Sequence, residues 1–297
     1  MDEAIIILAG ATGNLGGRIA RSIHDRGANL RAIVRHSSDP EKVEKLRRLG
    51  AEIAVVDFNN LPELTEACSG GSCVVSALSG LREVIVDTQT LLLDAAVKAG
   101  VPRFIPSDYS IDFTKTPPGT NRNLDLRREF HELLNKAQIA ATSILNGMFM
   151  DLLIGEAPMI LFKLKRVVYW GDADQLLDFT TMDNSAEFIA TAAIDSSTPR
   201  FLRIAGDQIS ASGMVEAVSE VTGKGFRLLR AGGLGRLSIL IKVTRAILFK
   251  SKALYPPWQG MQYVHNMFSG LAKLEPLDND RYPDISWTTI KDFLAAQ

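Results

Sequence analysis

Short apolar runs alternate with helical patterns over the first 145 residues. The runs that predict strands are AIIIL at 4–8, LRAIV at 30–34, EIAVV at 52–56, CVVSAL at 73–78, RFIP at 103–106 and TSIL at 142–145. Helices are predicted after the glycine-rich turn that follows the first run and around 39–50, 61–68, 82–99 and 124–137. Because all-apolar strands alternate with helices of this length, we predict βαβ units with right-handed crossovers and a parallel sheet.

The pattern loosens after residue 150. FKLKRVVYW, LLDFTT and FLRIA indicate further strands, NSAEFIATAAI at 184–194 indicates a helix, and the chain from Asp207 onward is mostly helical. We therefore predict an α/β fold. A doubly wound Rossmann domain spans 1–205, with an excursion near 151–180, and a smaller helical substrate lobe spans 206–297. Ligands of open α/β sheets bind beyond the carboxyl ends of the strands, so a lobe placed there would close a pocket.

Two helical segments carry further information. In NLDLRREFHELL at 123–134, a stripe of Leu126, Phe130, Leu133 and Leu134 has helical spacing, and the candidate working groups Arg127 and His131 lie one turn apart beside it. LSILIKVTRAILF at 237–249 is too short and too charged to span a bilayer. We expect it to be a helix buried on one face rather than a membrane-surface or dimer helix.

The turn after the first strand has the pattern of a phosphate-binding loop. In ILAGATGNLGGRIA, Gly10, Gly13 and Gly16 are spaced G-x-x-G-x-x-G between a strand and a helix. Glycine lets the backbone turn tightly and approach a pyrophosphate, whose charge is favoured by the free N–H groups and dipole of the helix N-terminus. The strand before the turn and the helix after it make a dinucleotide site the expected interpretation.

The end of the second strand indicates which dinucleotide is bound. A fold that selects NAD usually has an Asp or Glu about 20 residues after the loop, bound to the ribose 2′-hydroxyl. Here Arg35 stands 19 residues after Gly16, followed by His36, Ser37 and Ser38. An arginine can pair bidentately with a 2′-phosphate. The sequence therefore predicts NADP(H).

Composition and charge exclude several classes of function. The chain has 33 Lys and Arg against 34 Asp and Glu, a formal net charge of −1, which offers no general basic surface for nucleic acid. Only Cys68 and Cys73 are present, and they form neither a disulfide framework nor a zinc pattern. HELLN at 131–135 lacks the second histidine of a zinc motif, so we expect no metal. The start MDEAIII has no basic region typical of a signal peptide, which favours a cytoplasmic protein.

Several motifs occur in an order that resembles a known family. They are GATGNLGG, VRHSS, VVDFNN at 55–60, VVSALSG, RFIPSDYS and the ending RYPDISWTTIKDFL at 281–294. Together they resemble the NmrA-like and isoflavone-reductase-like branch of the atypical short-chain dehydrogenases, over nearly the whole chain. The resemblance implies an NADP-binding Rossmann domain, a small helical substrate lobe and a small-molecule substrate. A homodimer is compatible with the sequence but not required by it.

The resemblance also implies positions for the cofactor and the substrate. The phosphate loop would be Gly10, Thr12, Gly13, Asn14, Leu15 and Gly16. Arg35 would hold the 2′-phosphate, Asp57 and Phe58 would lie by the adenine, Ser76, Ala77 and Leu78 by the nicotinamide-side ribose, and Pro106, Ser107 and Asp108 by the nicotinamide. GMFMDLL at 147–153 would line the substrate side, and the candidate substrate contacts are Asn146, Met148 and Phe149.

Two departures bear on catalysis. None of the five tyrosines has a lysine four residues later, so the Tyr-x-x-x-Lys pair of ordinary short-chain dehydrogenases is absent. The lysine of isoflavone-reductase-like enzymes corresponds to Arg127. Arginine keeps its proton, so Arg127 can fix a carboxylate or stabilise an oxyanion but cannot easily shuttle a proton. The proton donor would be Tyr109, His131, Asp108 or water, with Tyr109 as the first choice. Alternatively, Arg127 is a solvated or paired surface residue.

Two functions fit these observations. The first is an NADPH-dependent reductase that transfers hydride to a small, largely apolar or aromatic carbonyl or enone. The second is a non-enzymatic NADP(H)-sensing regulator that acts through a protein partner, for which the lost lysine would be expected. The helical lobe at 206–297 favours the enzyme, because a pure sensor has less need of a segment that closes a pocket.

Overall fold

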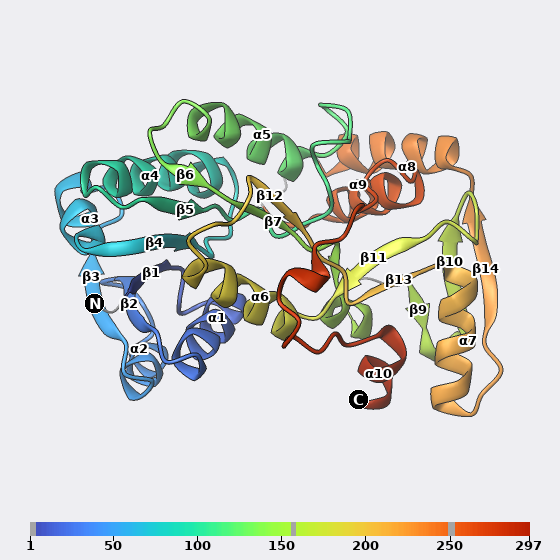
Figure 1. Cartoon of the computed structure of the whole chain (residues 1–297). Helices are drawn as coiled ribbons and strands as arrows, with labels where there is room; N and C mark the ends of the chain where they lie inside the picture. Colours follow the sequence, from blue (N-terminus) through green and yellow to red (C-terminus); the bar gives the residue numbers. More distant parts are fainter. Residues whose placement is uncertain (1–3, 156–158, 249–252) are drawn as a thin grey trace.

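A six-stranded parallel sheet organises the first half of the molecule (Figure 1). The computed structural model describes residues 4–155, 159–248 and 253–297. In spatial order the strands are β3 (Glu52–Val56), β2 (Asn29–Arg35), β1 (Ile5–Ala9), β4 (Gly71–Ser76), β5 (Arg103–Ile105) and β6 (Ala140–Ala141). The chain moves outward from β1 to β3 and then crosses to β4, on the other side of β1. The predicted doubly wound α/β fold is confirmed.

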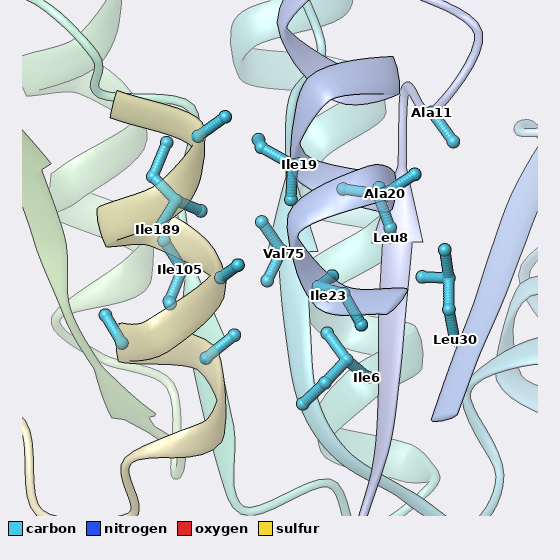
Figure 2. Packing of buried hydrophobic residues seen from close by; sticks show 14 of the residues in the cluster. Ile6, Leu8, Ala11, Ile19, Ala20, Ile23, Leu30, Val75, Ile105 and Ile189 are labelled. Carbon is cyan, nitrogen blue, oxygen red and sulfur yellow. The ribbon is translucent and has the colours of Figure 1, made fainter. Parts of the chain in front are cut away.

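Helices cover both faces of this sheet. They are α1 (Asn14–Asp25), α2 (Pro40–Arg48), α3 (Leu61–Cys68), α4 (Gln89–Lys98), α5 (Arg122–Leu134) and α6 (Met182–Ile194). The helix predicted over 82–99 begins with a π-helical segment, Glu83–Thr88, before α4. Figure 2 shows one face, where Ile19 and Ile23 of α1 and Ile189 of α6 lie against the strands. A second core, under α3, α4 and α5, covers the other face.

The rest of the chain builds a second lobe around a third core. β7 (Ser143–Leu145) pairs with β12 (Phe201–Arg203), and this pair contributes to two cores, with Ile144 and Leu202 in the core under α1 and α6 and Leu145 in the third core. The other short strands form two sheets of the second lobe. They are β8 (Met148–Phe149) with β11 (Leu177–Thr180) and β13 (Asp207–Ile209), and β9 (Ile160–Leu161) with β10 (Arg166–Trp170) and β14 (Arg227–Gly232). The helices of the second lobe are η2 (Met150–Ile154), η3 (Phe162–Leu164), α7 (Ala211–Thr222), α8 (Leu234–Ile247), α9 (Pro257–Phe268), η4 (Asn279–Arg281) and α10 (Ile290–Ala295).

This third core draws on segments before and after residue 205. Ile111, Leu124 and Leu145 contribute to it alongside Met214 and Ile290. The second lobe contains strands as well as helices. One of them, β14, lies in the stretch after Asp207 for which the sequence indicated mainly helices. The division of the chain at residue 205 stays a prediction.

The apolar stripe predicted on α5 is correct only in part. Phe130 and Leu134 are buried, but Leu126 is half-buried and Leu133 is 38% exposed. Leu124 and His131 are buried instead, so the buried face of α5 is rotated toward the face that carries Arg127 and His131. Both candidate working groups therefore lie on the inward side of the helix.

The prediction that the segment at 237–249 is buried on one face is wrong for most of its length. Of the described residues of α8, only Leu237 is buried, while Ile239 and Ile247 are 65% and 73% exposed. The reason is that α8 packs mainly on one neighbour, α9, which covers a narrow strip of the helix. Phe249, and Asp2 and Glu3 of the MDEAIII start, lie outside the described residues.

The packing of α6 on the sheet gives a direct test of the fold. We expect Ile189→Ala, which removes a fully buried side chain, to lower the free energy of unfolding by about 2 to 5 kcal/mol. Ile194→Ala at the end of the same helix, where the side chain is 40% exposed, is the matched control. Urea denaturation measures both. Equal losses at the two positions would contradict the placement of α6.

Candidate active site

The glycine-rich turn joins β1 to α1 in a backbone conformation that needs glycine. Gly10 has a φ of +87°, and its carbonyl accepts a hydrogen bond from the Gly13 N–H at 3.0 Å. A Cβ on Gly10 would lie 2.6 Å from the carbonyl oxygen of Ala77, and a Cβ on Gly16 would lie 2.1 Å from that of Gly10. The turn therefore sits directly against the end of β4. No side chain caps α1, so its first N–H groups remain available to an anion.

The end of β2 carries a positive charge beside an aromatic ring. The Arg35 guanidinium lies 5.2 Å from the centroid of the Phe58 ring, and the Arg35 N–H donates to the hydroxyl of Ser38. The nearby acids have other roles, because Asp39 caps α2 and the Asp57 carboxylate accepts hydrogen bonds from Asn59. An exposed arginine with no competing carboxylate fits the recognition of a 2′-phosphate.

The ends of β4 and β5 are tied together. Ser107 donates its hydroxyl hydrogen to the carbonyl of Leu78 at 2.6 Å, and its N–H donates to the side-chain oxygen of Gln89 at 2.9 Å. The Ala77 N–H donates to the Ala9 carbonyl, which extends the β1–β4 pairing by one residue. Gln89 was not predicted as a site residue. It is fully buried on α4, and it fixes the segment that begins at Pro106.

A buried ionic cluster follows β5. His131 Nε2 lies 2.6 Å from Oδ2 of Asp108 and 3.4 Å from the hydroxyl of Ser143. On the other side of the ring, His131 Nδ1 lies 3.2 Å from one terminal nitrogen of Arg200, which also donates to Oδ1 of Asn135. The other terminal nitrogen of Arg200 donates to the hydroxyl of Ser143. We call Asp108, His131, Ser143 and Arg200 the Asp–His–Arg cluster. It joins β5, α5, β7 and the residue before β12.

The arrangement fixes which nitrogen of His131 carries the proton. A guanidinium nitrogen only donates hydrogen bonds, so Nδ1 must accept from Arg200 and is unprotonated. Nε2 then carries the hydrogen and donates it to Asp108. Asp108 is fully buried, and burial by itself raises the pKa of its carboxyl. The electrostatic interaction and hydrogen bond with His131, the hydrogen bond from Ser143 and the charge of Arg127 outweigh burial and hold this pKa below its usual value.

Three members of this environment were missed from the sequence. Ser143, Asn135 and Arg200 show no motif, and Arg200 is 69 residues from His131. The signal that could have found them is the pairing of two predicted strands. The parallel register Phe201↔Ser143 between β12 and β7 brings Arg200 beside Ser143. Strand pairing of this kind is not encoded in either segment alone.

Arg127 and Tyr109 occupy different environments. Arg127 lies one turn before His131, donates to the carbonyl of Asn123 at 3.1 Å, and has a buried Nε without a protein partner. Tyr109 packs in the core under α1 and α6, and its buried hydroxyl also lacks a described partner. Burial, with the charge of Asp108, raises the pKa of Tyr109 well above its usual value. That Tyr109 donates a proton stays a prediction.

The predicted substrate contacts lie at the junction of the two lobes. Asn146 follows β7 and donates to the hydroxyl of Ser185 at 3.1 Å, while its side-chain oxygen is buried without a partner. On β8, the half-buried Met148 packs on the core of the second lobe and Phe149 on the core under α1 and α6. That these three residues contact a substrate stays a prediction.

Comparison with known proteins identifies the family. The sequence profile of the NmrA-like family matches residues 2–233, well over half of the chain. The chain belongs to the NmrA-like family. Pinoresinol reductase 2 of Arabidopsis thaliana is 29% identical over 212 residues, which are 66% of this chain and 67% of that protein. Oxidoreductase swnN of Metarhizium robertsii is 25% identical over 97% of this chain and 96% of its own.

A solved structure shares the fold of this NmrA-like chain. AtPrR2 with NADP+ and (+)pinoresinol superposes with a TM-score of 0.82 at 22% identity, covering 100% of this chain and 99% of that one. The two chains therefore share a fold over their full length.

Several buried polar atoms of this NmrA-like chain lack a partner among the described residues, and their positions show whether a dinucleotide and a substrate would fit. Ser76 Oγ, Asp108 Oδ1, Arg127 Nε and Asn146 Oδ1 are buried and lack partners. Buried polar groups are normally satisfied, so such atoms mark places for ligand or water. Three of them follow or end strands, at the edge where open α/β sheets bind ligands. Together with the glycine turn and Arg35, this set fits NADP(H).

Two other features bear on the predictions. Within residues 4–155, 159–248 and 253–297, no group of three or more His, Cys, Asp or Glu is placed to hold a metal ion. Among the helices of these residues, none combines the length and the hydropathy needed to cross a bilayer.

The lowered pKa of Asp108 predicts a pH-dependent stability. A carboxyl whose pKa is lower in the folded state contributes stability above its unfolded pKa of about 3.9, and loses it as the pH falls through the folded value. We expect Asp108→Asn to lower the free energy of unfolding by about 2 kcal/mol at pH 7, and by less as the pH is lowered below 4. Urea denaturation across this range measures it.

The control for this prediction is Asp94→Asn, at an exposed position of α4. It should change the free energy of unfolding little at any pH. A loss for Asp108→Asn that stays constant down to the lowest pH would show that the carboxylate charge is not what the cluster stabilises.

Proposed function

We propose that this chain is an NADPH-dependent reductase that transfers hydride to a small, largely apolar or aromatic carbonyl or enone. The observation that carries the proposal is the coincidence of three features at one sheet edge. These are the glycine turn packed against β4, the cation at the end of β2, and the unpartnered buried atoms of Asp108, Arg127 and Asn146.

The cofactor would be held by residues at the ends of five strands, β1 to β5. The N–H groups that follow Gly10 would bind the diphosphate, and Arg35 the 2′-phosphate, with Phe58 beside the adenine. Ser76 would meet the nicotinamide-side ribose, and the segment Pro106–Asp108 would border the nicotinamide. NADPH bound there supplies a hydride, and the protein supplies orientation and charge.

Arg127 has the chemistry to stabilise negative charge on the substrate. Its guanidinium remains protonated, and the hydrogen on its buried Nε has no protein acceptor. A substrate oxygen that gains charge as hydride arrives could accept this hydrogen bond. A fixed donor in a buried environment is worth more than one in water, because it needs no reorganisation during the reaction.

The Asp–His–Arg cluster lies close enough to this donor for the charge of Arg127 to act on Asp108. Because His131 donates its one hydrogen to Asp108, it does not itself present a proton to a substrate. Asp108 keeps one oxygen bound to His131 and leaves the other free beside the charge of Arg127. We therefore assign His131 and Arg200 to positioning, and Arg127 to oxyanion stabilisation. Asp108 Oδ1 is suited to order a water molecule that delivers the final proton.

The regulator hypothesis is less well supported. The relatives described above are named as a reductase and an oxidoreductase, and the structural neighbour is described with both NADP+ and a small-molecule ligand. The cytoplasmic location and a homodimer remain predictions.

The first test concerns cofactor selection. We expect Arg35→Ala to weaken NADPH binding about tenfold to hundredfold, because charge-assisted hydrogen bonds are worth about 1.5 to 3 kcal/mol. Binding of NADH should be unchanged, since it lacks the 2′-phosphate. Calorimetric titration measures both, with Arg48→Ala on the exposed surface of α2 as control. Equal weakening for NADPH and NADH would refute the role of Arg35.

The second test concerns turnover. With quinones, enones or aromatic aldehydes as substrates, we expect Arg127→Ala to lower kcat about 10²- to 10³-fold while the Kd for NADPH changes little. Arg127→Lys should retain part of the activity and lose it at alkaline pH, because a buried lysine can release its proton. Glu132→Ala, exposed on the same helix, is the control. Tight NADPH binding with no turnover of any substrate class would favour the regulator.

A further inference from the structure

Helix α8 presents an apolar face with nothing packed on it in the described chain. Ile239, Val243 and Ile247 are 65%, 50% and 73% exposed, and Leu240 beside them is 39% exposed. Their spacing of four residues places them on one side of the helix. We call these four residues the α8 stripe. Contiguous apolar patches of this kind mark interaction sites.

The sequence around the α8 stripe is strongly basic. From Val221 to Leu274 there are nine Lys and Arg and no Asp or Glu, which leaves 24 basic against 34 acidic residues in the rest of the chain. The near-zero net charge therefore conceals a segregation of charge. The second lobe carries a positive segment, and the remainder of the protein is acidic.

Two of these cations flank the α8 stripe. Arg236 precedes Leu240 by one turn and so lies on the same face, and Lys242 lies at its side. Both are exposed, and none of the ion pairs found among the described residues involves either of them. Arg245 differs, because it lies over the ring of Trp258 on α9. The free surface of α8 therefore combines apolar side chains with cations at its edge.

We propose that the α8 stripe docks on the surface of an anionic lipid bilayer. A helix with apolar residues on one face and lysine or arginine beside them lies in the interface plane, with its apolar side chains among the acyl chains and its cations at the lipid phosphates. The proposed interaction is peripheral, and no helix of the described residues is both long and apolar enough to span a bilayer.

The geometry favours a planar surface over a protein groove. The opposite side of α8 is occupied by α9, through buried Leu237 and a contact of 3.0 Å between the hydroxyl of Ser238 and Nε2 of His265. A groove that binds an amphipathic helix encloses more than one of its sides. A bilayer needs only the one side that α8 presents.

The charges disfavour a second copy of this chain on the same face. A two-fold dimer through the α8 stripe would place Arg236 and Lys242 near their own counterparts. The acid-free segment around them offers no carboxylate to balance that charge, and like charges across an interface cost binding energy. Anionic lipid has the complementary charge.

Vesicle flotation tests the proposal with the full-length protein. We expect it to float with vesicles of phosphatidylcholine and phosphatidylserine, and much less with vesicles of phosphatidylcholine alone. Added salt should weaken the interaction, since part of it is electrostatic and exposed. Flotation does not depend on reductase activity. The result therefore holds even if the proposed reductase function is wrong.

Two variants separate the contributions. Ile239→Gln, Val243→Gln and Ile247→Gln together should lower the partition coefficient at least about tenfold, through lost apolar burial. Arg236→Glu with Lys242→Glu should lower it by a similar factor, through lost attraction to anionic lipid. All five positions are exposed, so the thermal midpoints of both variants should stay close to that of the parent protein.

Matched controls change the same residue types elsewhere. Leu133→Gln with Ile194→Gln alters exposed apolar residues of α5 and α6, and Lys98→Glu with Lys136→Glu alters exposed charges. Both should float like the parent protein. The proposal is overturned if the parent floats with neither vesicle, or if the controls lose as much binding as the α8 variants. It is also overturned if sedimentation equilibrium finds a dimer that the glutamine variant dissociates, because a second copy would then cover the α8 stripe.

Discussion

The close contact between the glycine turn and the end of β4 determines where this protein can bind a ligand. β1 and β4 are neighbours in the sheet, so the turn that leaves β1 must pass over Ala77. No side chain fits at Gly10 or Gly16 without displacing backbone. No side chain caps the helix that follows, so the first N–H groups of α1 remain available to an anion beside this contact. The site for a diphosphate is thus a consequence of strand order and of two missing Cβ atoms.

The Asp–His–Arg cluster is the second constraint, and it connects the two halves of the molecule. Asp108 comes from the loop after β5 and His131 from α5, whereas Arg200 precedes a strand that pairs with β7 beyond the six-stranded sheet. Burying a carboxylate and a guanidinium is costly unless each is paired. Here the imidazole lies between them, so two charges are accommodated without direct contact. The hydrogen-bond roles of Asp108, His131 and Arg200 follow from one fact, which is that a guanidinium cannot accept a hydrogen bond.

Local signals in the sequence predicted the sheet and its nucleotide turn well. The runs at 52–56 and 61–68 match β3 and α3 at both ends, because short strands and helices with clear caps are set by nearby residues. The cluster around His131 could be predicted only in part. Asp108 and His131 sit near recognisable motifs, but Ser143 and Arg200 reach them through the pairing of β7 with β12. That pairing depends on contacts between segments 58 residues apart in sequence (Ser143 and Phe201).

Helix α8 shows why periodicity alone could not complete the prediction. An apolar stripe of helical spacing has the same pattern whether a neighbouring helix, another molecule or a lipid surface covers it. The sequence predicted a helix here, and the expectation of burial failed for the α8 stripe because α9 covers the opposite side. The net charge of −1 was also uninformative, because it averages over a chain that includes a segment of 54 residues without Asp or Glu. The distribution of charge along the chain, combined with the exposed side of α8, distinguishes between the possible partners where the totals do not.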